Sequence, residues 1–398
     1  MYLELPRRAA RLANLRGIHG RLRPWAEQET HSHNSHERPS SDATPTHDMP
    51  SLTDLIRVVQ PATATPEIED IFSASLGLIF TDDLRNQHGD PGATIVYRPS
   101  SARIRDKIEN GRQERRSGGL QTGATDNDEE VDRLAVNFGV SGGEIELSVA
   151  DPKGEDERRL FAHYLWNAGI LMAEMIAAAS EHDTEGIAGR EHTRWSVQGE
   201  IVLELGAGVG LVGIVSVLAG AAKVTMTDYP SDPILRNLDS NVKKNIPSSL
   251  LPCVEIAAHN WGLLPTTAST TYTNSSELFS VAHVSQFTLI LAADCLWMPQ
   301  EHRNLARSML YFLSTSANAR ILCAAGFHTG RAVLVSFFDV AIEEGLEVAE
   351  IWEEDDAGRR RECSHERGVE GIAERNRWVV GAVLRRRGGG EKVAETNA

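Results

Sequence analysis

The chain has 398 residues, of which 41% are hydrophobic, and 40 Lys and Arg against 56 Asp and Glu give it a formal net charge of −16 at pH 7. This length allows one large domain or two of ordinary size, and the low hydrophobic fraction predicts a folded core accompanied by poorly ordered segments. A chain this acidic argues against a general nucleic-acid-binding protein, which needs a basic face to neutralise phosphates. Basic protein surfaces and small molecules remain as partners.

The cysteines and the apolar runs indicate in which cellular compartment the protein is expected. No cysteine belongs to a CxxC pair or to a zinc-ligand spacing with histidine, so we expect no metal site. Cys253, Cys295 and Cys323 lie in apolar surroundings and are expected to be buried free thiols, which suits a reducing compartment, and we expect a cytoplasmic protein. No apolar run approaches the roughly 20 residues of a membrane span. The N-terminus lacks a secretory apolar core, although its arginines leave a mitochondrial signal open.

The N-terminal part of the sequence predicts little regular structure. Residues 1–66 are expected to form a disordered arm, because residues 24–66 are rich in Pro, Ser, Thr, His and charge without a sustained period. Residues 67–142 are expected to form a partly ordered extension, in which ATIVYRP (residues 93–99) predicts a short strand. The basic and then acidic run at residues 103–130 predicts a solvated linker or a long insertion.

A folded domain is expected over residues 143–387, followed by a disordered tail at 388–398. It begins with GEIELSVAD, which alternates like a strand. The following run, ERRLFAHYLWNAGILMAEMIAAASEH, has a helical period. Its apolar side carries Leu165, Ile170, Leu171 and Met175.

From Glu200 onward, short apolar runs alternate with helical segments. The first five runs are IVLEL, KVTMTD, CVEIAAH, FTLILAADCLW and ARILCAAGF, which predict βαβ units in a parallel sheet. The last two, LEVAEIWEE and RWVVGAVLRR, are separated by a charged segment and predict an antiparallel hairpin at one side of the sheet. Residues 266–278 form a polar insertion between the third and fourth runs. The fold class is therefore α/β, with a Rossmann-like sheet.

The first run ends in a glycine-rich turn, GAGVG, where the backbone can approach a ligand closely. A phosphate loop is excluded because no Lys-Ser or Lys-Thr follows the turn. A dinucleotide site is disfavoured because Leu211 stands at the third glycine position of GxGxxG. S-adenosylmethionine is the third candidate ligand, and a tight turn packed without any ligand remains a further interpretation.

Two carboxylates flank this turn. Glu204, two residues before the first glycine, favours S-adenosylmethionine, because a carboxylate there attracts sulfonium and amino groups and repels a pyrophosphate. Asp228 ends the second run, and its carboxylate can accept hydrogen bonds from ribose hydroxyls. NAD offers the same hydroxyls, so Asp228 alone does not discriminate between the two ligands.

Later runs add further candidates. Trp261 follows the third run, where an indole can cover an adenine face or can be a buried core residue. Asp294 ends the fourth run, at the edge where open α/β sheets bind ligands, and helix capping is its competing interpretation. After the fifth run, His328 and Arg331 either contact substrate or cap a helix.

The segments VLELGAGVGL, VTMTDYP, NWG and LILAADCLW resemble motifs of the seven-stranded S-adenosylmethionine-dependent methyltransferases, specifically the lysine-methyltransferase-like group called methyltransferase family 16. HYLWNAGILMAEMI is similar to the LLWN[AS]G segment of its fungal branch termed nicotinamide N-methyltransferase-like, which includes elongation factor 1-alpha methyltransferases. The similarity covers about residues 143–387. It implies a seven-stranded class I sheet with helices on both faces, and S-adenosylmethionine as the cofactor.

The resemblance also implies roles for individual residues. The glycine turn would wrap the methionine moiety, and Asp294 and Trp297 are the catalytic candidates. Trp297 stands where lysine methyltransferases of this group often carry tyrosine. The implied cofactor-binding residues are Trp166, Glu204, Gly206, Ala207, Gly208, Asp228, Tyr229, Trp261 and Ala293.

These motifs are specific for the cofactor and uninformative about the acceptor. We predict an N-methyltransferase that acts on a protein amine, either a lysine or an N-terminus, with a translation factor among the candidate substrates and with neither nucleic acid nor membrane as a partner. In such a reaction, the Asp294 carboxylate can orient the amine or help it lose a proton. Methylation of a small pyridine such as nicotinamide, a non-catalytic cofactor-binding or scaffold protein, and a dehydrogenase are the alternatives.

Overall fold

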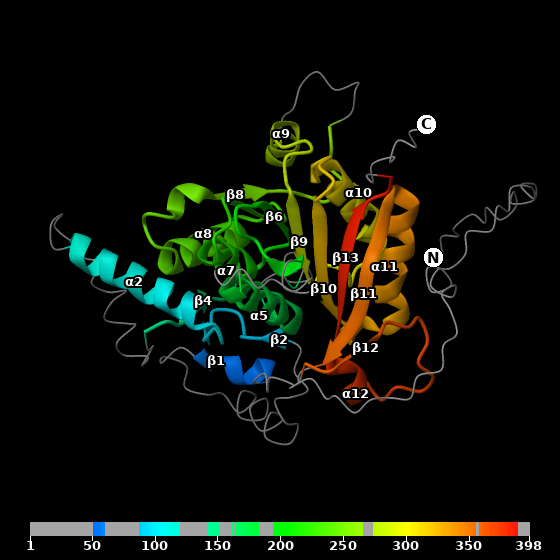
Figure 1. The fold of residues 1–398 in the computed structure, drawn as a ribbon, viewed down its shortest axis with the longest axis horizontal. Helices are drawn as coiled ribbons and strands as arrows, with labels where there is room; N and C mark the ends of the chain where they lie inside the picture. Colours follow the sequence, from blue (N-terminus) through cyan, green and yellow to red (C-terminus); the bar gives the residue numbers. More distant parts are fainter. Residues whose placement is uncertain are drawn as a thin grey trace, which may run out of the picture. The chain divides into compact units, whose positions relative to one another are not determined.

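A mixed eight-stranded sheet forms the centre of the described part of the chain, in the order β12-β11-β13-β10-β9-β6-β7-β8 (Figure 1). Its parallel strands are β6 (Ile201–Leu205), β7 (Lys223–Asp228), β8 (Val254–Ala258), β9 (Leu289–Ala293) and β10 (Arg320–Gly326). On the β10 side, antiparallel pairing adds β13 (Trp378–Arg386), β11 (Leu346–Asp355) and β12 (Arg360–Glu362).

The computed structural model describes residues 51–59, 87–119, 142–151, 161, 164–182, 194–265, 274–355 and 358–388. All of them belong to one compact unit, residues 47–398. Most of the predicted arm, much of the polar insertion and all but the first residue of the predicted tail lie outside the described residues. None of the described helices is both long and apolar enough to cross a membrane.

The sheet confirms the α/β prediction, including the C-terminal hairpin of β11 and β13. All seven predicted runs form strands, and β12 adds a three-residue edge strand that the charged sequence of that segment did not indicate. The central strands form because they are continuous apolar runs: β10 is buried along its whole length, as expected of a parallel strand covered on both faces.

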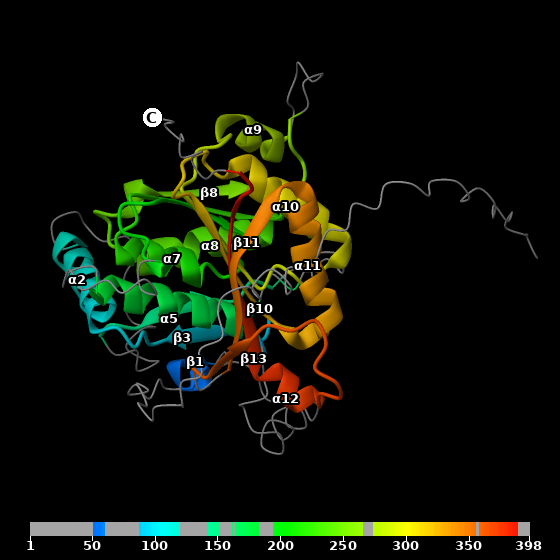
Figure 2. The same ribbon diagram turned by 45° about the vertical axis from the view of Figure 1, so that its right-hand side comes forward.

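Helices cover both faces of the sheet (Figure 2). One face carries α5 (Asn167–His182), α7 (Leu211–Ala219) and α8 (Asp232–Asn245), and the other carries α9 (Ser275–Ala282), α10 (His302–Phe312) and α11 (Arg331–Glu344). Short 3-10 turns occur at η4 (Leu251–Cys253), η5 (Pro299–Glu301) and η6 (Phe327–Thr329), and α12 (Ile372–Asn376) precedes β13. Within the predicted helical run, the observed helix α5 begins only at Asn167. Leu165, expected on its apolar side, lies instead in strand β5 (Leu165–Trp166), which pairs with β2 (Gln87–His88).

The chain passes from β6 outward to β7 and β8 and then returns to β9 on the other side of β6. This reversal makes the β6–β9 boundary a topological switch point, where open α/β sheets leave a crevice at the carboxyl ends of their strands. Glu204 and Gly206 close β6 at this crevice, and Asp294 closes β9.

A second, three-stranded sheet is formed by β1 (Ile56–Val59), β3 (Thr94–Tyr97) and β4 (Ile145–Ser148). The predicted strands at β3 and β4 are thereby confirmed. The prediction of disorder is wrong for residues 51–59, because η2 (Leu52–Leu55) buries two leucines and leads directly into β1. The predicted boundary at residue 143 separates β3 from its partner β4, so it does not divide two independent units.

The predicted charged linker is wrong over its first part, which forms helix α2 (Ala102–Gly119). Ile104 and Ile108 lie one turn apart and are both buried, against α5 and α7. A Cβ on Gly111, one turn further along, would lie 2.5 Å from Cγ of Pro247, so only glycine allows that approach. Three well-spaced small or apolar residues therefore anchor a helix whose composition is otherwise that of a solvated segment.

We expect Ile108→Ala to lower the free energy of unfolding by about 2–5 kcal/mol, because it leaves a cavity under α2. Urea denaturation followed by circular dichroism measures this change. Ile372→Ala is the matched control, because Ile372 is exposed, and it should change the midpoint little. Equal effects of the two substitutions would mean that α2 is not anchored through Ile108.

Candidate active site

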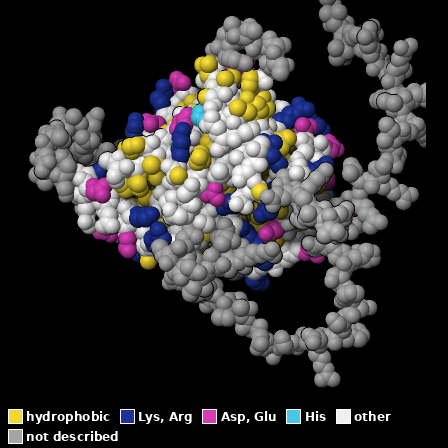
Figure 3. Space-filling model, turned by 45° about the horizontal axis from the view of Figure 1, so that its top comes forward, with side chains coloured by type: hydrophobic (Ala, Val, Ile, Leu, Met, Phe, Trp, Pro, Cys, Tyr) yellow, Lys and Arg dark blue, Asp and Glu magenta, His cyan; other side chains and the backbone are white. Residues whose placement is uncertain are grey.

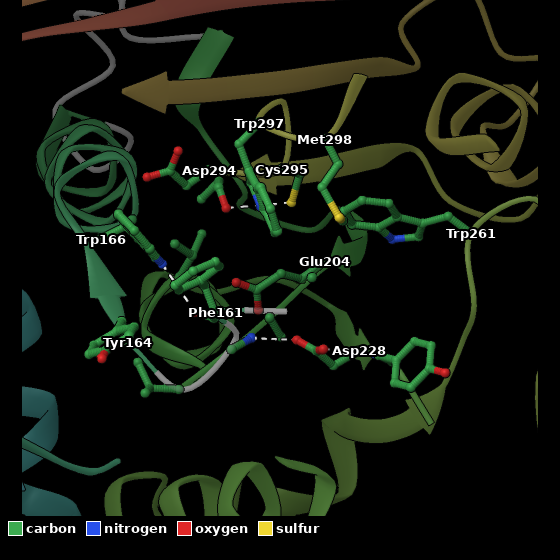
Figure 4. Close-up of a pocket in the computed structure, with 18 of the residues that line it drawn as sticks. Phe161, Tyr164, Trp166, Glu204, Asp228, Trp261, Asp294, Cys295, Trp297 and Met298 are labelled. Atoms are coloured by element: carbon green, nitrogen blue, oxygen red, sulfur yellow. Dashed lines mark hydrogen bonds between the residues drawn. The ribbon is translucent and has the colours of Figure 1, made fainter. Parts of the chain in front are cut away.

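A cavity of about 350 Å³ lies at the carboxyl ends of β6, β7, β8 and β9 (Figure 4). Its volume falls within the usual range of small-molecule sites. Every residue that the sequence indicated for cofactor binding or catalysis lines this cavity: Trp166, Glu204, Gly206, Ala207, Gly208, Asp228, Tyr229, Trp261, Ala293, Asp294 and Trp297. Their spatial convergence is thus observed, whereas their individual roles remain predictions.

The glycine turn between β6 and α7 forms one wall. Gly206 has φ of +69°, and a Cβ there would lie 2.8 Å from Sγ of Cys295 and 3.3 Å from Cζ2 of Trp261. Any larger residue would therefore be strained and would push into the cavity. The amide of Ala207 donates to the carbonyl of Thr227 at 2.9 Å, which fastens the turn to β7.

Glu204 lies under this turn, and its carboxyl oxygen Oε2 is buried without a hydrogen-bond partner among the described residues. A Cβ on Gly213 would lie 2.5 Å from that oxygen, so the glycine of α7 gives the carboxylate its space. Burial raises the pKa of Glu204 to about 8, while the nearby amide of Gly213 opposes the rise and the charge of Asp228 adds to it. A buried carboxylate with an unused oxygen is costly by itself, and a cationic ligand in the cavity would satisfy it.

Asp228, at the end of β7, faces the same cavity (Figure 4). Its Oδ2 accepts from the amide of Gly208 at 2.8 Å and its Oδ1 from the amide of Tyr229 at 2.7 Å. Burial raises the pKa of Asp228 to about 6, and these two amides oppose the rise. Each carboxylate oxygen has a further lone pair for a ligand hydroxyl.

Trp261 is half-buried and lines the cavity, so the interpretation as an ordinary core tryptophan is wrong. It lies beside Met298 in Figure 4, across from Asp228. Its position therefore suits a flat ligand ring, because indole faces stack well on other aromatic rings.

Asp294 follows β9 in the left-handed conformation, with φ of +57°. Such a conformation is uncommon outside glycine, although Asp and Asn tolerate it best. The Asp294 amide donates to the carbonyl of Ala324 at 2.7 Å, and its Oδ1 accepts from the amide of Gly326 at 3.3 Å. The helix-capping interpretation is wrong, because Met298 and Glu301 occupy the N-cap positions of η5 and α10.

The Asp294 side chain is almost wholly buried. Burial raises the pKa of Asp294 to about 6, while the charge of His328 and the amide of Gly326 pull it down. This carboxyl group therefore changes its ionisation close to neutral pH, which suits a group that takes up or releases protons.

Four aromatic side chains also line the cavity. The ring of Phe161 meets Trp297 edge-on at 5.5 Å, and Tyr164 meets Trp166 edge-on at 6.1 Å. The sequence analysis missed Phe161 and Tyr164 as site residues, although both belong to the aromatic run FAHYLW that contains Trp166. Together these four rings give the cavity a largely apolar side.

His328 and Arg331, which the sequence could not assign, separate clearly in the structure. Arg331 is buried and forms ion pairs with Glu353 and Glu370, and neither Arg331 nor His328 belongs to the cavity lining. His328 stacks on Trp166, with ring centroids 4.6 Å apart and an interplanar angle of 23°.

Comparisons with known proteins agree with this site. Residues 151–332, which contain all the predicted site residues, match the profile of the family described as lysine methyltransferase. The chain is 30% identical over 223 residues to the protein N-terminal and lysine N-methyltransferase efm7 of Schizosaccharomyces pombe, covering 53% of this chain and 77% of that protein. It is 31% identical over 204 residues to the protein of the same name, EFM7, from Gibberella zeae, covering 48% of this chain and 68% of that one.

Among solved structures, Aeropyrum pernix fibrillarin in complex with S-adenosyl-L-methionine matches 46% of this chain and 66% of its own length, with a TM-score of 0.31 and 12% identity. The sequence relatives and the family profile identify the family. The chain belongs to the lysine methyltransferase family.

Proposed function

We propose that this protein transfers a methyl group from S-adenosylmethionine to an amine of another protein, on a lysine side chain or at an N-terminus. The unpartnered carboxylate oxygen of Glu204, buried under the glycine turn, is the observation that carries the proposal. The relatives named protein N-terminal and lysine N-methyltransferase support the choice of acceptor. They give no support to a nicotinamide-like acceptor, to a non-catalytic scaffold or to a dehydrogenase.

The cavity residues fit this cofactor, which supplies a methyl group on a positively charged sulfonium. Glu204 would balance the cofactor's positive charge, and the absence of side chains at Gly206 and Gly208 would let the backbone approach it. Asp228 would accept ribose hydroxyls, and Trp261 would cover the adenine. These roles agree with those that the family resemblance implies.

The acceptor side lies at Asp294. A protonated amine has no lone pair to attack carbon, so Asp294 would take its proton before the N–C bond forms and the C–S bond breaks. Phe161 and Trp297 would pack on the aliphatic stem of a lysine and exclude water, which favours alignment of the two reactants. Trp297 would do so without the hydroxyl that a tyrosine would place there.

Partners and location are assigned on the same basis. On the face shown in Figure 3, Lys and Arg side chains of the described residues are interspersed with acidic and apolar ones, as expected for a protein whose substrate is not nucleic acid. All four cysteines are free thiols, three of them buried and Cys253 half-buried rather than fully buried as predicted. A translation factor as substrate and a cytoplasmic location are parts of this proposal.

The function is tested by incubating the purified full chain with tritium-methyl S-adenosylmethionine and a lysate of cells that lack this protein. We expect label in precipitated protein, released on hydrolysis as methyl-lysine or as an N-terminal methylamino acid. Label confined to the small-molecule fraction would favour the nicotinamide-like alternative. Cofactor binding without transfer to either fraction would favour a scaffold.

We expect cofactor binding to release a proton near neutral pH. Burial keeps Glu204 protonated below its pKa of about 8, and a bound cation favours the ionised carboxylate. Affinity should therefore rise with pH and level off above about pH 8, where Glu204 is already ionised. Calorimetry in buffers of different ionisation enthalpy measures the released proton.

Glu204→Gln should abolish the proton release and weaken binding at pH 8 by about tenfold or more, since one pKa unit corresponds to about 1.4 kcal/mol. Glu255→Gln is the matched control, because Glu255 lies on β8 outside the cavity and pairs with Lys223. It should keep both the proton release and the affinity. Equal proton release from Glu204→Gln and the wild type would show that another group ionises.

A further inference from the structure

His328 lies next to Asp294, and the proposed function gives it no role. It lies in η6, directly after β10, and its Nε2 is 3.8 Å from Oδ1 of Asp294. Its Nδ1 is buried and has no hydrogen-bond partner among the described residues. His328 does not cap a helix, because Gly326 and Gly330 hold the N-cap positions of η6 and α11.

The ring of His328 is held from two sides. Trp166 stacks on one face, with the centroids 4.6 Å apart. A Cβ on Gly326 would lie 3.2 Å from Nδ1 of His328, so a side chain at position 326 would crowd the imidazole, and it would lie 4.0 Å from Oδ2 of Asp294, in ordinary contact. The amide of the same glycine donates to Asp294. The imidazole and the carboxylate are therefore placed next to each other by the stacking on Trp166 and by the turn that follows β10.

Methyl transfer to an ammonium releases a proton, which Asp294 and His328 could carry away. An ammonium acceptor and the sulfonium cofactor yield a methylated ammonium and a neutral thioether, so each transfer releases one proton. Asp294 can take that proton from the ammonium, but its side chain is only 4% exposed, against 17% for His328. A proton held on Asp294 therefore needs a neighbouring base that reaches solvent.

The other titratable groups around Asp294 do not meet this need. Burial raises the pKa of the Cys295 thiol far above its usual range and that of Cys323 to about 12, so neither exchanges protons near neutral pH. Glu204 and Asp228 lie on the cofactor side of the cavity, under and beside the glycine turn. Glu301, at the η5 side, accepts from the side chain of Asn304.

We propose that His328 is the positioning and proton-exit residue for Asp294, which rests on the proposed methyl transfer to a protein amine. The ammonium N–H bond breaks and its proton passes to the Asp294 carboxylate. The proton then moves to Nε2 of His328 once the two groups close their 3.8 Å separation. The same nitrogen releases it to water, because Nδ1 is buried, and the imidazole returns to its neutral form. The freed amine nitrogen forms the N–C bond as the C–S bond breaks, and Asp294 is ionised again for the next turnover.

The test uses the full chain, tritium-methyl S-adenosylmethionine and dialysed lysate protein as the methyl acceptor, over a range of pH. For His328→Gln we expect the initial rate of methyl transfer at saturating cofactor to fall by about 100-fold, the scale of a lost proton-transfer group, with cofactor affinity by calorimetry within about threefold of wild type. The acidic limb of the rate profile should move to higher pH, because His328 no longer lowers the pKa of Asp294.

Chemical rescue separates this role from a purely structural one. For His328→Ala we expect added imidazole to restore activity in proportion to its neutral form, because the missing ring leaves space beside Trp166. His365→Gln is the matched control, since His365 is an exposed histidine on the segment that follows β12, and it should keep the wild-type profile.

The outcomes distinguish the two proposals. A wild-type protein that labels no protein overturns the proposed function and this inference together. An active wild type, with His328→Gln unchanged in its pH profile and no imidazole rescue of His328→Ala, overturns the role of His328 alone. Loss of cofactor affinity in both variants would show that His328 only supports the cavity, and would also overturn the inference.

Discussion

Replacing Gly206 with arginine is expected to weaken S-adenosylmethionine binding by at least about 100-fold, or about 2.7 kcal/mol. Gly206 has φ of +69°, and a Cβ placed on it would lie 2.8 Å from Sγ of Cys295 and 3.3 Å from Cζ2 of Trp261. An arginine side chain would enter the cavity that the cofactor is proposed to fill, and would bring a second positive charge to Glu204. Calorimetric titration with S-adenosylmethionine and S-adenosylhomocysteine measures the loss.

A matched glycine separates backbone strain from occlusion of the site. Gly199 also has a positive φ, of +74°, but no heavy atom lies within 4 Å of a Cβ placed there. Gly199→Arg should therefore cost some stability and leave cofactor affinity near the wild-type value. Tight cofactor binding by Gly206→Arg would show that the cofactor binds elsewhere.

Asp294→Asn is expected to lower kcat by about 10²–10⁴-fold, the usual contribution of a positioned acid–base group, while cofactor affinity stays within about threefold. Asparagine tolerates the left-handed backbone of this position and keeps nearly the same shape, so the substitution removes the titrating carboxylate and little else. Initial rates of methyl transfer to protein, measured at saturating cofactor, show the effect.

The pH dependence gives the same residue a second signature. The pKa of Asp294 is raised by burial to about 6, and the carboxylate must be ionised to accept a proton. Wild-type activity should therefore fall as the pH drops through about 6, and Asp294→Asn should lack that limb. Asp232→Asn, on the exposed start of α8, is the control and should retain it. If Asp294→Asn still lost activity as the pH dropped through about 6, that loss would belong to another group.

Much of the sheet could be predicted because its signal is local. Parallel strands covered on both faces appear as short, mainly apolar runs, and the five such runs after Glu200 form parallel strands, while the last two runs form antiparallel strands. The C-terminal hairpin followed from the charged connection between β11 and β13, which has no apolar run long enough for a crossover helix. The edge strand β12 could not be predicted, because its three residues are Arg, Arg and Glu, which ion pairs with Glu353 and Glu354 hold in place.

The N-terminal errors have a common cause. Helix α2 and the segment 51–59 each carry only two large apolar residues that are buried, within a charged or polar composition. Their order comes from surfaces elsewhere in the fold, since α2 packs on α5 and α7 and β1 pairs with β3. Composition averages over a window conceal such sparse anchors, whereas the spacing of Ile104 and Ile108 contained the signal.

The candidate site was predicted well where it depends on strand ends. Parallel strands bring their carboxyl ends to one edge, so Glu204, Asp228 and Asp294 converge without any knowledge of side-chain packing. The stacking of His328 on Trp166 could not be foreseen, because these residues are far apart in the sequence and meet only after β10 and β5 are placed. The same holds for the edge-on contact of Phe161 with Trp297.

The most direct test of the account is mass spectrometry of the proteome from cells with and without this protein. We predict methylation of a lysine or an N-terminal amine on a defined protein, which is absent without this chain, restored by the wild-type chain and not restored by Asp294→Asn. A proteome whose protein-amine methylation is the same with and without the chain would contradict the account.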